Sequence, residues 1–497
     1  MANVSVTADP AEREGWKRAG YSEALINDDL APAKQRNWKT WSITCMWMSD
    51  VHSVGGYVFA AGLFFLGLTG WQVLIALLVG ICIVNYFMNR MGLPGHRLGV
   101  PYPVFARVSF GVFGANIPAL IRAVIGIAWY GIQTWLASVA VVVLLLAIFP
   151  GLKPWAEVES GAFGLSPLGW FAFVVMWALQ LAVFYRGIET IRRFIDFCGP
   201  AVYVVMFLLA IWIVSKAGWA SLNLNLSDKQ LTTGEVIYTM AMAAALVVSY
   251  FSTLLLNFGD FSRFTDSPET VKRGNFWGLP VNFTAFSLVT VVVTAGTVAV
   301  FGEAILDPVE IVARIPNVFV VILGAATFVI ATIGINIVAN FVSPAYDLAN
   351  VAPKYIDFKR GGLITSLAAF FVMPWHLYNS PVAINLFLGG LGAVLGPLYG
   401  IMMADYYLVK REQVNVDDLF RASPASAYWY QNGVNMTAVK AFLPASLVAI
   451  VLALMPGLEA LAPFSWFVGA GLGASLYYWL AKGQPVMAPG LPPKQPA

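Results

Sequence analysis

The chain has 497 residues, of which 59% are hydrophobic and only 11% are charged, with a mean hydropathy of +0.74. Soluble domains carry about 25% charged residues, so this composition excludes a soluble protein and predicts one embedded in a membrane. The net charge is a small +3, and we expect no nucleic-acid partner, metal or cofactor. Continuous apolar runs such as VAVVVLLLAIF favour helices over the alternating strands of a β-barrel.

A helix needs about 20 apolar residues to cross a hydrocarbon core about 30 Å thick. Twelve segments are predicted to do so, at 41–68, 71–91, 117–149, 168–185, 190–216, 235–258, 276–301, 316–342, 361–378, 381–409, 437–458 and 462–481. We group them as two five-helix repeats over 41–216 and 235–409, followed by two C-terminal helices over 437–481. The remaining parts are an N-terminal segment at 1–40, loops at 217–234 and 410–436, and a tail at 482–497.

Basic residues concentrate in alternate connections between these segments. The connections on the side of the N-terminus hold most of them, including Arg90, Arg97, Arg186, Arg192 and Arg273. The connections on the other side hold only Lys153, Lys216, Lys229 and Arg314. Because basic loops stay in the cytoplasm, this asymmetry predicts a multi-pass protein of the cell membrane with both termini cytoplasmic and 217–234 outside.

Two crossings are predicted to be interrupted near their middle. The first contains DVHSVGG at 50–56, and the sixth contains SYFST at 249–253, five crossings later. Broken helices at matching positions of two halves are typical of inverted-repeat transporters with a site at the midplane of the bilayer. The alternative is a tolerated kink in each helix, because glycine is common in membrane helices and serine can bond its own backbone.

Asp50 and His52 lie at the depth of the first break, where an ionisable group is unfavourable by at least about 2.5–3.5 kcal/mol unless it faces a cavity or a partner. The two residues lie on different faces of an intact helix and converge only if it unwinds, which Gly55 and Gly56 make easier. We therefore assign both a function. The alternative is that Asp50 bonds a neighbouring helix and His52 is a neutral structural histidine.

Polar side chains also share faces of the third and eighth crossings. Trp129 and Gln133 are four residues apart, so an indole that can stack on a planar ring lies beside an amide that can bond the ring edge. Asn336 and Asn340 repeat this spacing, and two buried amides on one stripe need a ligand or another helix as partner. The alternatives are an interface anchor for Trp129 and bonding between helices for the amides.

Three charged residues are given structural roles. Arg122 is placed near the cytoplasmic end of its crossing, with its guanidinium extended toward the interface. In GDFSRF, after the sixth crossing, Asp260 and Arg263 are expected to form an ion pair or a gate element.

Several motifs resemble the nucleobase:cation symporter-1 family, whose members carry cytosine, uracil, purines, allantoin, hydantoins and related heterocycles. They are WMSDVHSVGGY, WYGIQTW, NFGDFSRF, NFVSPAYDLANVAP and GPLYGIMMADYYLVKREQVNVDDLF, and the likeness covers nearly the whole chain. The first motif is closer to the allantoin-type branch than to the cytosine-type one. The resemblance implies the leucine-transporter-type fold, a five-plus-five inverted repeat with broken helices 1 and 6, two extra C-terminal helices and alternating access.

The same resemblance implies a substrate site. It matches Trp129 and Gln133 to the family's stacking tryptophan and amide, Asn340 to its substrate-binding asparagine, and Phe251 to its second stacking aromatic. A substrate ring would lie between Trp129 and Phe251, with aromatic contacts worth about 0.5–1.5 kcal/mol each. The expected substrate-binding residues are Trp129, Gln133, Phe251, Tyr250, Asn340, Asn336, His52 and Ser53. At the position of a glutamine of the first crossing the chain offers Ser53 or Val54, and His52 is expected to take over that polar role.

The chain departs from the family pattern at the coupling ion. The family's sodium site uses a hydroxyl pair on the eighth crossing, but the matching positions are Gly334 and Ile335, and an alkyl group cannot bind a hard cation. A carboxyl group in an apolar cavity can instead take up and release a proton. We expect proton coupling, and the candidate positions are Asp50 first, then His52, Ser49 and Ala331. Sodium bound at Asp50 is the alternative.

Together these observations predict a secondary transporter that imports a small planar nitrogen heterocycle. Uracil or a related pyrimidine is placed first, followed by allantoin, hydantoin, a purine or urocanate. An enzyme is not expected, because the three histidines are scattered and the sequence has no HExxH motif. A non-transporting sensor of the same fold is the remaining alternative.

Overall fold

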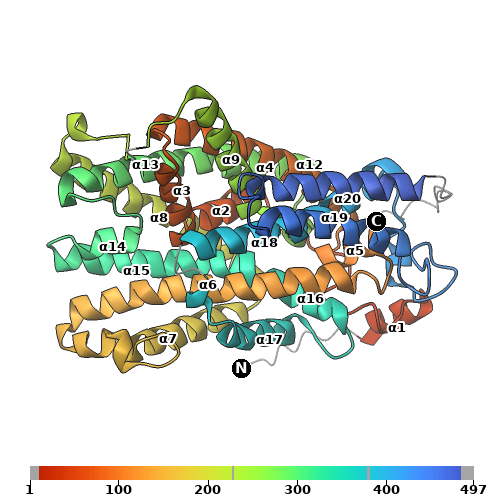
Figure 1. The fold of residues 1–497 in the computed structure, drawn as a ribbon. Coiled ribbons are helices and arrows are strands. Elements are labelled where there is room, and N and C mark those ends of the chain that lie inside the picture. Colours follow the sequence, from red (N-terminus) through yellow and green to blue (C-terminus); the bar gives the residue numbers. More distant parts are fainter. Residues whose placement is uncertain (1–9, 227–228, 378–380, 483–497) are drawn as a thin grey trace.

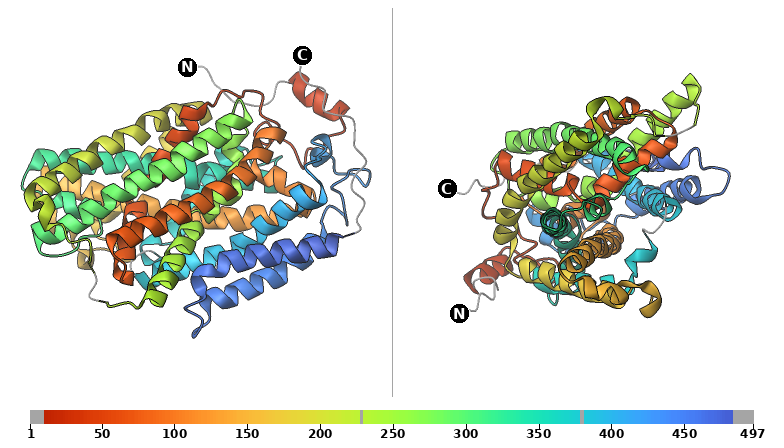
Figure 2. Two further views of the ribbon diagram at one scale, coloured as in Figure 1. Left: turned by 90° about the horizontal axis from the view of Figure 1, so that it is seen from above. Right: turned by 90° about the vertical axis from the view of Figure 1, so that its left-hand side faces the viewer.

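The computed structural model describes residues 10–226, 229–377 and 381–482. Helices make up the regular structure of these ranges, where the three β-bridges are isolated pairs. Figure 1 shows the helices as a bundle of elongated rods, and Figure 2 shows the same bundle from above and along its length. The predicted all-α class is confirmed.

The helices of the bundle follow the predicted crossings. They are α2 (Thr40–Val51) with α3 (Val54–Gly62), α4 (Gly70–Leu98), α6 (Asn116–Ile148), α7 (Pro167–Phe184), α8 (Ile188–Ala217), α9 (Thr233–Tyr250) with α10 (Ser252–Asn257) and α11 (Gly259–Ser262), α12 (Pro268–Phe276) with α13 (Asn282–Phe301), α15 (Val318–Ile335) with α16 (Ser343–Val351), α17 (Phe358–Phe371), α18 (Pro381–Met403), α19 (Met436–Leu454) and α20 (Ser465–Ala481). Shorter helices outside the predicted crossings are α1 (Pro10–Arg18), α5 (Tyr102–Phe110) and α14 (Pro308–Ala313).

Nine helices among the described residues are long and apolar enough to cross a membrane. The other three predicted crossings contain shorter helices: the first is divided between α2 and α3, while α17 has 14 residues and α20 has 17. Several helices also extend past the predicted ends. For example, α4 was predicted to end at 91 but continues to Leu98. The helix is ended by Gly99, which has a left-handed backbone conformation (φ 71°), and not by the fall in hydropathy.

Both predicted breaks are present. Between α2 and α3, the Oγ of Ser53 accepts a hydrogen bond from the N–H of Gly56 at 2.9 Å and so caps the start of α3. Between α9 and α10, Phe251 has φ −84° and ψ 2°, which ends one helix before the next begins. Gly55 lies beside Gly56 in the first turn of α3, just beyond the break. The capping serine, and not the glycine pair, therefore marks the interruption.

The broken helices lie inside the bundle. α2 packs against α8, α12 and α13, while α4 packs against α9 and α12. On the other side, α6 packs against α15 and α16, and α18, α19 and α20 lie side by side along one edge (Figures 1 and 2). α1 and the end of α20 lie at the same end of the bundle (Figures 1 and 2), as an even number of crossings requires.

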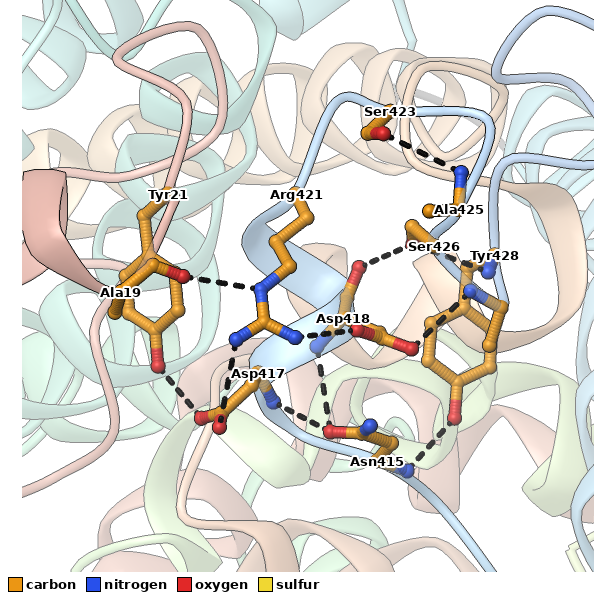
Figure 3. Close-up of polar contacts among 11 residues, drawn as sticks. Ala19, Tyr21, Asn415, Asp417, Asp418, Arg421, Ser423, Ala425, Ser426 and Tyr428 are labelled. Atoms are coloured by element: carbon orange, nitrogen blue, oxygen red, sulfur yellow. Dashed lines mark hydrogen bonds and ion pairs between the residues drawn. The ribbon is translucent and has the colours of Figure 1, made fainter. Parts of the chain in front are cut away.

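The segment after α1 is hydrogen-bonded to the loop between α18 and α19 (Figure 3). Tyr21 donates a hydrogen bond through its hydroxyl to Asp417 at 2.6 Å, and Arg421 donates through Nε to the carbonyl of Ala19 at 3.1 Å. Burial and the hydrogen bond to Asp417 raise the pKa of the Tyr21 hydroxyl, so the phenol remains protonated and remains the donor.

The same segment also reaches the motif GDFSRF. Arg263 donates to the carbonyl of Asp29 at 3.0 Å, and its guanidinium lies 4.6 Å from the ring centroid of Tyr346. Asp260 instead accepts from the backbone N–H of Tyr102 at 2.7 Å. Asp260 and Arg263 therefore form no salt bridge with each other in the described ranges, since each side chain bonds a segment that lies far away in the sequence. A role of the two residues in a gate stays a prediction.

Candidate substrate-binding site

The glycine pair of the first crossing brings three helices close together. A Cβ on Gly55 would lie 3.1 Å from Nε2 of Gln133 on α6. A Cβ on Gly56 would lie 2.8 Å from the carbonyl oxygen of Val51 and 3.7 Å from the hydroxyl of Tyr250 on α9. The glycines thus give α3 a bare backbone surface against which the amide and the phenol can lie.

Aromatic rings fill the space between α3, α6, α9 and α18. Trp129 meets Tyr250 edge to face, with 5.7 Å between ring centroids, and meets Phe387 at 5.3 Å. Tyr250 stacks on Phe59 at 4.9 Å and meets Phe251 at 5.4 Å. Such faces and edges suit a planar ligand. The sequence analysis did not single out Phe59 or Phe387.

Phe251 lies toward the other side of the break. Its side chain is buried, and its ring meets Trp47 of α2 at 6.4 Å and Phe283 of α13 at 5.7 Å. Of the two aromatic residues at this break, Tyr250 is the one in direct contact with Trp129. A substrate ring held between Trp129 and Phe251 stays a prediction.

Gln133 has an amide whose hydrogen bonding is incomplete. The side chain is only 3% exposed, and its Oε1 atom has no hydrogen-bond partner among the described residues. A buried acceptor without a partner is unfavourable by about 1–3 kcal/mol. Nε2 of the same amide lies next to the α3 backbone, and the side chain is one turn from Trp129, so Oε1 is free to receive a donor from a bound ring.

The side chain of Asn336 forms hydrogen bonds to neighbouring helices of the bundle. Its Nδ2 lies 3.0 Å from the carbonyl of Tyr130, 3.0 Å from Oγ1 of Thr134 and 2.6 Å from Oε1 of Gln180, and its Oδ1 accepts from Asn340 at 3.0 Å. These bonds join the π-helical segment η6 (Asn336–Val342) to α6 and α7. They favour the alternative prediction for Asn336, in which the amide bonds neighbouring helices. Oδ1 of Asn340 accepts no hydrogen bond from the described residues.

Replacing Asn336 with alanine is expected to destabilise the fold by about 1–3 kcal/mol, because buried groups on α6 and α7 lose their donor. Thermal unfolding of the detergent-solubilised protein measures this, and Asn340→Ala is the matched control, with a smaller decrease in unfolding temperature. An unfolding temperature unchanged by Asn336→Ala would instead favour a role for Asn336 in binding.

Arg122 does not extend to the membrane interface, so that expectation is wrong. Its side chain is fully buried, and its Nη2 donates to the carbonyl of Ala339 at 2.8 Å. The acceptor belongs to η6, which lies between α15 and α16 and is 217 residues from Arg122 in the chain, so a partner inside the bundle holds the guanidinium. Arg122 therefore holds the backbone directly before Asn340.

Of the expected coupling positions of the first crossing, Ser49 lies close to the eighth crossing. Asp50 is in the last turn of α2 and 6% exposed, and its Oδ2 has no hydrogen-bond partner among the described residues. The Oγ of Ser49, likewise without a partner in the part of the chain described, lies 3.8 Å from where a Cβ on Gly334 would be. Ala331 is buried one turn before Gly334 on α15.

His52 is directed away from Gln133, toward α8 and α13. Its Nδ1 lies 3.1 Å from the carbonyl oxygen of Gly199, and its Nε2 lies 2.9 Å from Oδ1 of Asn282. Its ring also stacks on Phe286 at 4.7 Å. These contacts favour the structural alternative for His52, while a contact of His52 or Ser53 with substrate stays a prediction.

Comparison with known proteins places the chain among membrane permeases. The family model described as "Permease for cytosine/purines, uracil, thiamine, allantoin" matches residues 31–469. The allantoin permease of Bacillus subtilis (strain 168) is 39% identical over 468 residues, which are 93% of this chain and 94% of the relative. The purine-uracil permease NCS1 of Arabidopsis thaliana is 33% identical over 93% of this chain and 77% of its own length.

Solved structures share the fold. A closed conformation of Mhp1, a nucleobase-cation-symport-1 family transporter with bromovinylhydantoin bound, has a TM-score of 0.75 and 22% identity, covering 93% of this chain and 98% of that chain. A Na+-coupled sialic acid symporter has a TM-score of 0.60 and 14% identity, covering 96% of both chains. The predicted fold, a five-plus-five inverted repeat with broken helices 1 and 6 and two further C-terminal helices, is confirmed.

Proposed function

This chain belongs to the family of permeases for cytosine/purines, uracil, thiamine and allantoin, and on that premise we propose that it imports a small cyclic ureide or pyrimidine with a proton. The family and the relatives are permeases, so the chain is a transporter and not an enzyme. We place it in the cell membrane with both termini in the cytoplasm, the orientation that the basic connections favour.

The observation that carries the proposal is Oε1 of Gln133, which has no hydrogen-bond partner in the described part of the chain and belongs to a side chain one turn from Trp129 of the aromatic cluster. Allantoin, hydantoins and uracil all present N–H donors beside C=O acceptors on a flat ring. The amide of Gln133 can accept a hydrogen bond from, and donate one to, that edge of the substrate ring, while Trp129 and Tyr250 can cover the face of the ring. A site built this way rejects rings that lack the edge, because its own buried amide would stay unpaired.

Allantoin is the first substrate to test. The relative with 39% identity is named an allantoin permease, and so is a putative permease of Escherichia coli (strain K12) with 30% identity. Uracil, the first substrate predicted from the sequence, is kept as the second candidate because another relative is named a purine-uracil permease. Both rings offer the same alternation of donors and acceptors, so direct competition between them decides the order.

Proton coupling is proposed because the sodium positions lack oxygen ligands. Gly334 and Ile335 have no side-chain oxygen, and the hydroxyl of the neighbouring Thr332 already donates to the carbonyl of Phe328 at 2.8 Å. An ionised Asp50 at this depth would be unfavourable without a cation beside it, so a proton that neutralises it can accompany the substrate.

Uptake into proteoliposomes tests both parts of the proposal. Radiolabelled allantoin and uracil are supplied in sodium-free buffer under an imposed proton gradient, with and without a protonophore. We expect uptake that the protonophore abolishes and that sodium does not increase. Uptake that requires sodium would contradict proton coupling, and binding without any counterflow would identify a sensor.

A further inference from the structure

A groove outside the central site opens between α4, α18 and α20. It has a volume of about 520 Å³, within the range of small-molecule sites. Its lining comes from α4, from α18 and the following π-helical turn η8 (Ala404–Val409), and from α20. Figure 2 shows the two C-terminal helices, α19 and α20, along one edge of the bundle, so the groove belongs to the membrane-facing side of this region.

The floor of the groove is aromatic. The rings of Phe87, Tyr399 and Trp466 form a mutual cluster, with 5.5 Å between the first two centroids, 5.2 Å between Phe87 and Trp466, and 5.5 Å between Tyr399 and Trp466. The walls carry small residues: Gly400, Ala404, Ala470, Gly471 and Ala474. Gly400 lets α18 approach the backbone of Ala470 closely, and Gly471 leaves open space, since no atom lies within 4 Å of a Cβ there. A flat apolar floor with small walls suits a hydrocarbon chain.

One cation lines this groove. The guanidinium of Arg90 lies 5.2 Å from the ring centroid of Tyr86 and 5.2 Å from that of Tyr407. Within the described ranges, no carboxylate lies at ion-pair distance from it; its electrostatic neighbours are these two tyrosines. Tyr407 also donates its hydroxyl to the backbone carbonyl of Arg90 at 2.8 Å, which fixes the two residues relative to each other.

We propose that this groove binds an anionic phospholipid, with an acyl chain on the aromatic floor and the phosphate on Arg90. The charge selects the headgroup, because an uncompensated guanidinium attracts a net negative lipid and gains little from a zwitterionic one. The position of the groove on the membrane-facing side favours a lipid over a soluble anion. Tyr86 and Leu408 at the groove are more than half exposed, as expected for side chains that face hydrocarbon.

The bound lipid would connect two parts of the bundle. α4 packs against α9 and α12, beside the broken helices, whereas α20 packs against α18 and α19. A lipid in this groove touches α4 on one side and α18 and α20 on the other. This proposal does not depend on which substrate is carried, so it stands or fails apart from the proposed function.

Lipid binding to the purified full-length protein tests the proposal. Native mass spectrometry and thermal unfolding are recorded with phosphatidylglycerol, phosphatidylcholine or glycerol phosphate added. Arg90→Gln removes the exposed cation. Gly471→Leu fills the groove, because no atom lies within 4 Å of a Cβ there, and Gly390→Leu on α18 is the matched control at an equally open position outside the groove.

We expect the wild type and Gly390→Leu to bind phosphatidylglycerol about five-fold more tightly than Arg90→Gln does. Gly471→Leu is expected to lose this binding. Equal binding of phosphatidylglycerol by the wild type and Arg90→Gln would overturn the proposal, and so would equal binding of the two lipids by the wild type. Stabilisation by glycerol phosphate alone would also overturn it, because the acyl chain would then be irrelevant. If Gly471→Leu does not fold, the exposed Arg90→Gln decides.

Discussion

Replacing Gln133 with alanine is expected to weaken substrate binding by about ten- to a hundred-fold, as the loss of two hydrogen bonds to a ring edge implies. The same change is expected to leave the unfolding temperature of the empty protein unchanged or slightly higher. The reason is that Oε1 of Gln133 has no partner among the described residues, so truncation removes a buried polar atom that the fold does not use. Opposite effects on binding and stability separate a ligand-binding amide from a structural one.

Calorimetric titration of allantoin and uracil into purified protein measures the affinity, and scanning fluorimetry measures the unfolding temperature. Gly55→Ala is a second probe of the same contact, since its Cβ would lie 3.1 Å from Nε2 of Gln133 and displace the amide. We expect it to weaken binding less than Gln133→Ala does. Unchanged affinity in both variants would place the substrate elsewhere.

The crossings and the breaks could be predicted because the information for them is local. A run of apolar residues marks a crossing wherever it lies, and Ser53 between two apolar segments is a capping residue whose effect is confined to the next turn. The helix ends were less predictable for the same reason. Capping residues such as Gly99 end a helix several residues beyond the point where hydropathy falls.

The partners of the polar residues could not be predicted, because they come from distant segments. The spacing of Asn336 and Asn340 showed a shared face, but nothing local indicated that Gln180, 156 residues away, would bond Asn336. Arg122 was misplaced because its acceptor, the carbonyl of Ala339, lies 217 residues away in the chain, in the π-helical η6. Hydrophobic periodicity does not distinguish a π-helical turn from an α-helical one.

His52 and Asp50 show the same limit. They are two residues apart and both ionisable, so the sequence could rank them as proton carriers only by the chemistry of their side chains. In the folded chain His52 contacts α8 and α13 through both ring nitrogens, whereas Oδ2 of Asp50 has no hydrogen-bond partner in the described ranges. A group already held by two contacts contributes to the packing, while a carboxyl group without them can change its protonation without breaking the fold.

Replacing Asp50 with asparagine is expected to abolish concentrative uptake. If one proton accompanies a neutral substrate, a membrane potential of about 100 mV supports an accumulation of about fifty-fold in the wild type. The asparagine variant carries no exchangeable proton, so its accumulation should fall to the external concentration. Counterflow exchange should persist, because the amide has the shape of the neutral acid. Proteoliposomes with an imposed potassium diffusion potential measure both activities.

Asp347→Asn is the matched control for this assignment. Asp347 is a second buried acid, on α16, and neither of its carboxylate oxygens has a hydrogen-bond partner among the described residues. The charge of Arg122 acts on Asp347, together with that of a second acid, Asp260, whereas no cation acts on Asp50 among the described residues. We therefore expect Asp347→Asn to keep accumulation coupled to the proton gradient. Coupling lost in Asp347→Asn but retained in Asp50→Asn would move the proton site from the break in the first crossing to the carboxyl group beside Arg122.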